Sequence, residues 1–343
     1  MPLPLIVTAN AVIGKAWAGH VTGILAGLTS GATFLFGALI FAGVLGPPSP
    51  GASTSAIGVG LMVTGAAAAV LTSNPVRDRV AGILNIDPEN PVHTLALALA
   101  VVLLGMQVTL VTFSDVLASD RSQPPLSVLD LFAQEVPFLI LAATGVGLYI
   151  RRNTAQAVDR LGVVRPAWWQ VTLALAAAGL FFAFAQGIDA VSHQWTPQVA
   201  HNVDITTQHL FSGVLGSPAG IVALALLPAI CEEILFRGAL QPRLGLVVTA
   251  LLFTSIHTQY SISFDTLGVF VLAIGLGLIR KYTNTTTSGV AHATYNLIVS
   301  IGIGTEVVGL VVAVEVALVV VTVFGLRAYR RRAKAADTAA VRP

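Results

Sequence analysis

Residues 92–113 read VHTLALALAVVLLGMQVTLVTF and contain no lysine, arginine, aspartate or glutamate. A run of roughly 20 apolar residues is long enough to cross the hydrocarbon core of a bilayer, which is about 30 Å thick. In lipid, such a segment can satisfy its own backbone hydrogen bonds only as a helix. This stretch therefore predicts a membrane-spanning α-helix and an all-α fold around it.

The composition of the whole chain agrees with this prediction. Of 343 residues, 55% are hydrophobic and only 10% are charged, with a mean hydropathy of +0.84. Soluble domains carry about 25% charged residues, so a water-facing surface of this size is excluded. The single cysteine, Cys231, excludes an internal disulfide framework and a multi-cysteine metal cluster. No nucleic-acid-binding module is present, and the bilayer itself is the expected surrounding.

We interpret ten apolar segments as spans of one polytopic transmembrane bundle. The fourth segment has the most polar start, because Asp130, Gln134, Glu135 and Pro137 interrupt it. The segments cover residues 22–46, 55–73, 92–113, 131–150, 167–186, 219–241, 244–260, 265–280, 286–302 and 306–326.

The distribution of basic residues predicts the orientation of this bundle. With a cytoplasmic N-terminus, Arg121 is the one basic residue outside and Arg237 lies within a span, whereas all other lysines and arginines fall inside. Cytoplasmic loops carry such an excess of positive charge. Both termini are therefore expected in the cytoplasm, and the location is the cell membrane, the inner membrane of a bacterium. The basic tail 327–334 (RAYRRRAK) could bind anionic lipid, but a stop-transfer anchor is the simpler interpretation.

The chain divides into four regions by this pattern. They are an N-terminal region of about five helices without a recognised signature (1–186), an external loop (187–217), a set of core helices (218–302), and a last helix with a basic tail (303–343).

Two smaller patterns also make predictions about packing and metal binding. Gly23, Gly27 and Gly31 form overlapping small-xxx-small patterns, which in membrane helices indicate close helix packing. The external loop contains three histidines, but their spacing matches no ligand pattern of a zinc site, so we expect no metal there.

Ionisable side chains inside spans are costly, and each one therefore suggests a function. Here they gather in three of the last five segments. The sixth segment contains Glu232, Glu233 and Arg237 in CEEILFRGALQP, the seventh contains Phe253 and His257 in FTSIH, and the ninth contains His292 and Asn296 in HATYN.

The depths of these side chains in the membrane are similar. Glu232 is ten residues and His257 fifteen residues from the turn at Pro242, and His292 is eleven residues from Lys281. At 1.5 Å per residue they lie roughly 15, 22 and 16 Å into the membrane. Glu233 and Arg237 are four residues apart and can form an ion pair on one helix face. The three helices could therefore form one buried polar cavity.

Several chemistries are compatible with these residue types. Glu232, helped by His257, could deprotonate a water molecule while His292 and Asn296 stabilise an oxyanion. A divalent metal such as zinc, held by Glu232, His257 and His292, could acidify that water instead, although no HExxH motif is present. Nothing marks Cys231 as an activated nucleophile. A proton-coupled transporter would also use such groups.

The ordered motifs EExxxR, FxxxH and HxxxN resemble those of the CPBP family. That family includes the type II CAAX prenyl endopeptidases and the bacterial Abi or bacteriocin-immunity proteins. The resemblance covers about residues 218–302, and it implies an intramembrane endopeptidase of the CAAX-processing type that acts on a membrane-associated peptide or protein.

The resemblance also implies roles for individual residues. Glu232 and His257 would activate the water, and His292 and Asn296 would form the oxyanion side. Three further residues would support the site, namely Glu233, Arg237 and Phe253. The alternatives are a non-catalytic membrane scaffold or immunity-type protein and a proton-coupled transporter. The absence of matching broken helices in two halves of the sequence favours the protease over the transporter.

Overall fold

The computed structural model describes residues 2–46, 52–303 and 308–340, with side chains described as far as residue 332. Within these ranges the chain is helical and forms no strand, apart from one isolated bridge between Leu148 and Arg152. Seven helical stretches are long and apolar enough to cross a membrane. The protein is thus an all-α, multi-pass membrane protein, as the sequence predicts.

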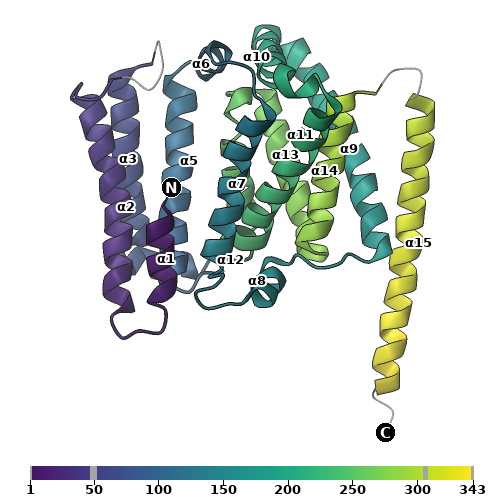
Figure 1. Ribbon diagram of the computed structural model, residues 1–343, viewed down its shortest axis with the longest axis horizontal. Helices are drawn as coiled ribbons and strands as arrows, with labels where there is room; N and C mark the ends of the chain where they lie inside the picture. The colour runs from purple at the N-terminus through teal and green to yellow at the C-terminus, as the bar shows by residue number, and fades with distance from the viewer. Residues whose placement is uncertain (1, 47–51, 304–307, 341–343) are drawn as a thin grey trace.

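Figure 1 shows the helices side by side in one broad bundle. They are α1 (Leu3–Ala11), α2 (Ala18–Phe41), α3 (Thr54–Thr72), α4 (Asn74–Ala81), α5 (Pro91–Phe113), α6 (Val116–Ser122), α7 (Val128–Gly145), α8 (Thr154–Leu161), α9 (Trp168–Trp195), α10 (Pro197–Leu215), α11 (Pro218–Glu232), η1 (Glu233–Leu240), α12 (Gln241–Ser255), η2 (Thr258–Tyr260), α13 (Phe264–Tyr282), α14 (Thr285–Ile301) and α15 (Val308–Ala340). Each of the ten predicted segments falls on one or two of these helices, except the sixth, which covers α11 and η1 and reaches the first residue of α12. The start of the tenth, at 306–307, and Arg342 of the basic tail lie outside the described residues. The count of ten spans and the cytoplasmic placement of both termini remain predictions.

Polar residues at the helix starts explain where several spans begin. The side chain of Asn90 accepts a hydrogen bond from the backbone of Val92 at the start of α5. Ser127 and Asp130 form a capping box at the start of α7. Such caps satisfy backbone N–H groups that have no partner inside the helix. Asp130, which interrupts the fourth predicted segment, is therefore a helix start signal rather than an interruption of a span.

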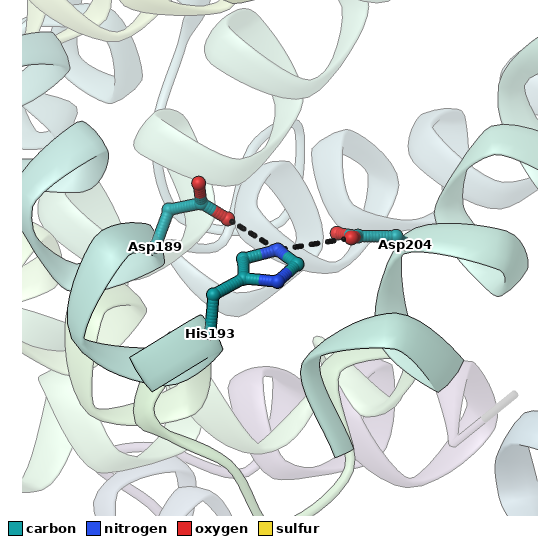
Figure 2. Close-up of side chains that lie close together, drawn as sticks. All are labelled: Asp189, His193 and Asp204. Carbon is teal, nitrogen blue, oxygen red and sulfur yellow. Dashed lines mark ion pairs between the residues drawn. The ribbon is translucent and has the colours of Figure 1, made fainter. Parts of the chain in front are cut away.

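The connection 187–217 is helical rather than an irregular loop. Helix α9 continues to Trp195, and α10 follows almost at once. Figure 2 shows His193 of α9 between two carboxylates, with Nε2 at 3.6 Å from Asp189 and 3.1 Å from Asp204 of α10. His209 instead contacts the backbone carbonyl of Gln123 at 2.8 Å. His193 and His209 thus contact different partners and do not meet at one point.

The predicted packing role of three glycines is wrong. A Cβ atom added at Gly23, Gly27 or Gly31 would meet nothing within 4 Å. Helices α2 and α3 do pack closely, but at other glycines. A Cβ at Gly37 would lie 2.7 Å from the backbone oxygen of Gly58, and a Cβ at Gly65 would lie 2.6 Å from the backbone nitrogen of Phe34. Small residues at a spacing of four occur on two faces of α2. Only the tertiary structure decides which of these faces meets α3.

Substitution of Gly65 by leucine is expected to destabilise the α2–α3 pair. The new side chain would overlap backbone atoms that cannot move independently, and overpacking of this kind costs about 1–3 kcal/mol. The measurement is the thermal unfolding midpoint of the purified protein. Gly27→Leu, on the face of α2 that no described residue contacts, should leave the midpoint unchanged. An equal decrease for both variants would contradict this assignment of the helix contact.

The last helices hold the residues of the three motifs in the middle of the bundle. Helix α14 packs against α11 and α9, α12 packs against η1 and α13, and α7 covers α11 and η1. Gly245, with φ +79° and ψ 172°, breaks the helix early in α12, so the chain can turn back along η1. A left-handed φ favours glycine because it has no Cβ. Helices α2 and α3 lie at one edge of the bundle and α15, packed on α9, at the other (Figure 1).

Candidate active site

The stretch η1, directly after α11, is a π-helix. Such segments are rare and frequently occur at functional sites. Within η1, Arg237 Nη1 lies 3.2 Å from Glu233 Oε1, and each side chain is only 1% exposed. The ion pair that the four-residue spacing predicts is therefore formed, and it is buried.

Helix α14 supplies two further partners for Glu233. The Ser288 hydroxyl donates a hydrogen bond to Glu233 Oε2 at 2.6 Å, and His292 Nδ1 lies 3.2 Å from Glu233 Oε1. A buried charge is tolerated when it is paired and hydrogen-bonded in this way. With Arg237, these contacts engage both oxygens of Glu233. They also fix the ring of His292, because a carboxylate can only accept a hydrogen bond from Nδ1–H.

Glu232, the last residue of α11, has a different environment from its neighbour. Its side chain is buried, and Oε2 lies 4.0 Å from Nε2 of His292. Among the described residues this oxygen has no hydrogen-bond partner. Buried polar atoms nearly always have a partner, and an exception in a native structure often marks a catalytic group or a bound water. Of the two adjacent carboxylates, Glu232 is thus the one that keeps an oxygen without a hydrogen bond among the described residues.

Phe253 and His257 bring α12 to the same cluster. The guanidinium carbon of Arg237 lies 4.1 Å from the centroid of the Phe253 ring. The Phe253 centroid is 4.7 Å from that of His257 and 5.9 Å from that of His292. His257 Nδ1 donates to the backbone carbonyl of Phe253 at 2.8 Å, since a carbonyl oxygen can only accept. The Nε2 atom of neutral His257 therefore keeps a lone pair for another partner.

Asn296 is the one motif residue for which the described part of the chain shows no side-chain hydrogen bond, ion pair or ring contact with this cluster. It lies one turn beyond His292 on α14 and is half-buried. Its side-chain amide makes no hydrogen bond within the part of the chain that the structure describes. The shared helix face with His292 is the observation that associates it with the site.

Three neighbours of the site were not among the predicted residues. Ser288 is fully buried against Glu233, and its position four residues before His292 could have indicated it. Glu135 of α7 is buried and close enough for its charge to interact with Glu232. Because it is an acidic residue inside an apolar segment, the sequence could have indicated it as a site residue. Tyr260, whose ring stacks on His257 at 6.5 Å between centroids, carried no signal in the sequence.

The arrangement does not fit a metal ion shared by Glu232, His257 and His292. Their residue types suit zinc, but ligand atoms of one ion must converge. Among the described residues, the group of three whose donor atoms all lie within 4.8 Å of one another is Asp189, His193 and Asp204, which is largely exposed and outside the motifs.

Comparison with known proteins decides the family. Residues 214–298 match the family model described as type II CAAX prenyl endopeptidase Rce1-like. The uncharacterized protein YpbD of Bacillus subtilis is 30% identical over 149 residues, which are 42% of this chain and 73% of the relative. The chain belongs to the Rce1-like family. No solved structure matches it.

The Rce1-like region begins near the end of α10 and ends within α14, so it includes all seven residues of the three motifs. At the level of the family, Rce1-like proteins are CAAX-type intramembrane proteases, and the resemblance in the motifs is thereby confirmed. The first five predicted spans and α15 lie outside the matched region.

Proposed function

We propose that this protein is an intramembrane endopeptidase that hydrolyses a peptide bond of a membrane-associated protein or peptide with activated water. The observation that carries the proposal is the contrast between two adjacent buried carboxylates. Glu233 is held by Arg237, Ser288 and His292, whereas Glu232 keeps an oxygen without a hydrogen bond beside His292. A desolvated carboxylate with a free oxygen suits a general base.

In the proposed reaction Glu232 takes a proton from water, and Nε2 of His257 orients that water. The water oxygen attacks the carbonyl carbon, and His292 and Asn296 face the oxyanion that forms. In this proposal Nδ1–H of His292 faces Glu233, and a proton on Nε2 is donated to the oxyanion. Return of the proton from Glu232 to the leaving nitrogen breaks the C–N bond and releases an amine and a carboxylic acid, which then gives up its proton.

A cavity that includes His257 in its lining offers a route by which the substrate reaches the site. It has a volume of about 500 Å³ and lies between α5, α12 and α13, with residues of η2 at its edge. Its lining is mainly apolar, with serine and threonine hydroxyls near His257. An extended peptide could reach the histidine here with its backbone groups hydrogen-bonded.

Treatment of the purified protein with a strong zinc chelator is expected to leave cleavage unchanged. The reason is the geometry of the donors, because Glu232, His257 and His292 do not converge on one point. The measurement is the cleavage rate before and after chelation and dialysis, with a known zinc protease as positive control. Loss of activity that only added zinc restores would show that the side chains rearrange around a metal.

The experiment that tests the proposed function compares the termini of membrane proteins in three strains. These express the wild-type protein, no protein, or Glu232→Gln at a matched level. New N- or C-termini that occur only with the wild type would establish proteolysis and identify the substrate. Identical termini in all three, with a deletion phenotype that Glu232→Gln rescues, would instead show a non-catalytic scaffold.

A further inference from the structure

A second cavity, of about 610 Å³, lies between α1, α5, α7, α8 and η1 and is separate from the reacting groups. Its lining includes neither Glu232, His257 nor His292. The wall has two parts of opposite character. One part is basic, with Arg151, Arg152, Arg160 and Arg243, and the other is apolar, with Ile6, Leu95, Leu99, Met106, Phe138 and Leu141.

The four arginines of the basic part lack acidic partners. Among the described residues, no carboxylate forms an ion pair within 4.0 Å of any of them. Asp87 lines the same cavity, and His93 Nδ1 accepts a hydrogen bond from the backbone of Asp87 at 3.0 Å. Four positive charges against one negative charge leave this end of the cavity strongly positive.

The hydrogen bonds of these arginines leave most of their donors free. Arg151 Nε donates to Asn10 Oδ1 at 2.7 Å, Arg152 Nη1 donates to the carbonyl of Val146, and Arg160 Nη1 donates to the carbonyl of Gly238 at 3.3 Å. The buried Nε of Arg243 has no partner among the described residues. Since a guanidinium group has five N–H donors, the cluster can still bind an anion with several charge-assisted hydrogen bonds.

The arginines of the cluster repel one another, and no acidic side chain among the described residues forms an ion pair with any of them. Burial and neighbouring guanidinium groups, Arg243 foremost, lower the pKa of Arg160 to about 10. The group remains protonated at neutral pH, so its positive charge is held against the repulsion of its neighbours. An anion bound among the arginines would relieve that repulsion.

The shape of the cavity distinguishes a lipid from a small anion. Along α5 its lining extends from Asn90 to Met106, which is roughly 24 Å at 1.5 Å per residue. One leaflet is half of a hydrocarbon core of about 30 Å. The apolar part is thus long enough for an acyl chain that begins at the arginines.

We propose that this cavity binds one anionic phospholipid, with its phosphate among Arg151, Arg152, Arg160 and Arg243 and an acyl chain along α5 and α7. The site also touches the π-helix, because Leu235 and Phe236 line the cavity and Arg160 bonds to the carbonyl of Gly238. A bound phosphate would hold Arg160 in this position and so stabilise η1, which carries Glu233 and Arg237.

The test measures lipid retention by the full-length protein with native mass spectrometry. The protein is purified in detergent with equal amounts of phosphatidylglycerol and phosphatidylcholine, and the bound lipid is counted. We expect one tightly held phosphatidylglycerol, and a loss of retention of about tenfold or more in Arg152→Gln/Arg243→Gln, since two charge-assisted contacts disappear. The matched control, Arg330→Gln/Arg331→Gln, removes the same charge from the exposed tail and should retain the lipid.

A second variant keeps the test decisive if the arginine variant fails to fold. Ala96→Phe fills the apolar part of the cavity and leaves all four arginines in place, so it should also lose phosphatidylglycerol. Inorganic phosphate at millimolar concentration should not displace the lipid. The proposal is overturned if the two lipids are retained equally, if the tail variant loses as much lipid as the cavity variant, if Ala96→Phe retains it, or if inorganic phosphate displaces it.

Discussion

Glu232→Gln is expected to lower the rate of substrate cleavage by about 10³-fold while the protein stays folded, because general-base catalysis contributes 10²–10⁴-fold. Glutamine has the same shape as glutamate but cannot take the proton from water. Among the described residues Oε2 of Glu232 makes no hydrogen bond, so a neutral amide there breaks none and removes only the 4.0 Å approach of the carboxylate to Nε2 of His292. The unfolding midpoint should therefore stay close to that of the wild type.

The cleavage rate should be measured with the substrate that the comparison of termini identifies. Glu89→Gln is the matched control, because Glu89 is exposed and outside the cluster, and it should retain full activity. Retention of more than a tenth of the wild-type rate by Glu232→Gln would exclude Glu232 as the base. In that case Glu135, the acidic neighbour on α7, would be the next candidate.

Arg237→Met is expected to have the largest effect on stability. It removes the cation from a pair in which both side chains are 1% exposed, and leaves Glu233 charged and buried. Breaking a buried ion pair from one side costs about 3–5 kcal/mol. The contact of the guanidinium with the Phe253 ring and its hydrogen bond to the carbonyl of Ala273 at 3.3 Å are lost as well. The measurement is the free energy of unfolding in mixed micelles.

A double variant separates the loss of the pair from the loss of packing. Glu233→Gln/Arg237→Met removes both charges, so it should recover most of the stability that Arg237→Met loses, although not the activity. Ser288 can still bond to the glutamine side chain. If the double variant is as unstable as the sum of the two single variants, the ion pair is not the source of the effect.

The spans could be predicted from the sequence because lipid imposes a simple rule on each segment separately. An apolar run of sufficient length must be helical, whatever its neighbours are, and all ten predicted segments fall on helices. The helices in 187–217, which was predicted only as an external loop between spans, could not be inferred in this way, because that rule does not apply to a polar stretch. Its helix depends on contacts such as that of His209 with the loop at Gln123.

For the site, the spacing of residues was informative only along one helix. The pairing of Glu233 with Arg237 follows from a separation of four residues, which the π-helix preserves. The sequence could not show that Ser288 and His292 of α14 also contact Glu233, because those contacts depend on how α14 packs against α11. For the same reason it could not find Tyr260, or decide that Asn296 has no hydrogen bond with the cluster.

By itself, the sequence determined that this chain is a multi-pass helical membrane protein and that its ionisable residues gather in three late helices. Both follow from the cost of polar groups in lipid, which acts on every residue regardless of the fold. The tertiary structure alone decided which glutamate is engaged and which keeps a free oxygen, and which glycines touch a neighbouring helix. It also decided that four arginines from three segments line one cavity, because such contacts depend on how the helices pack, which no local pattern specifies.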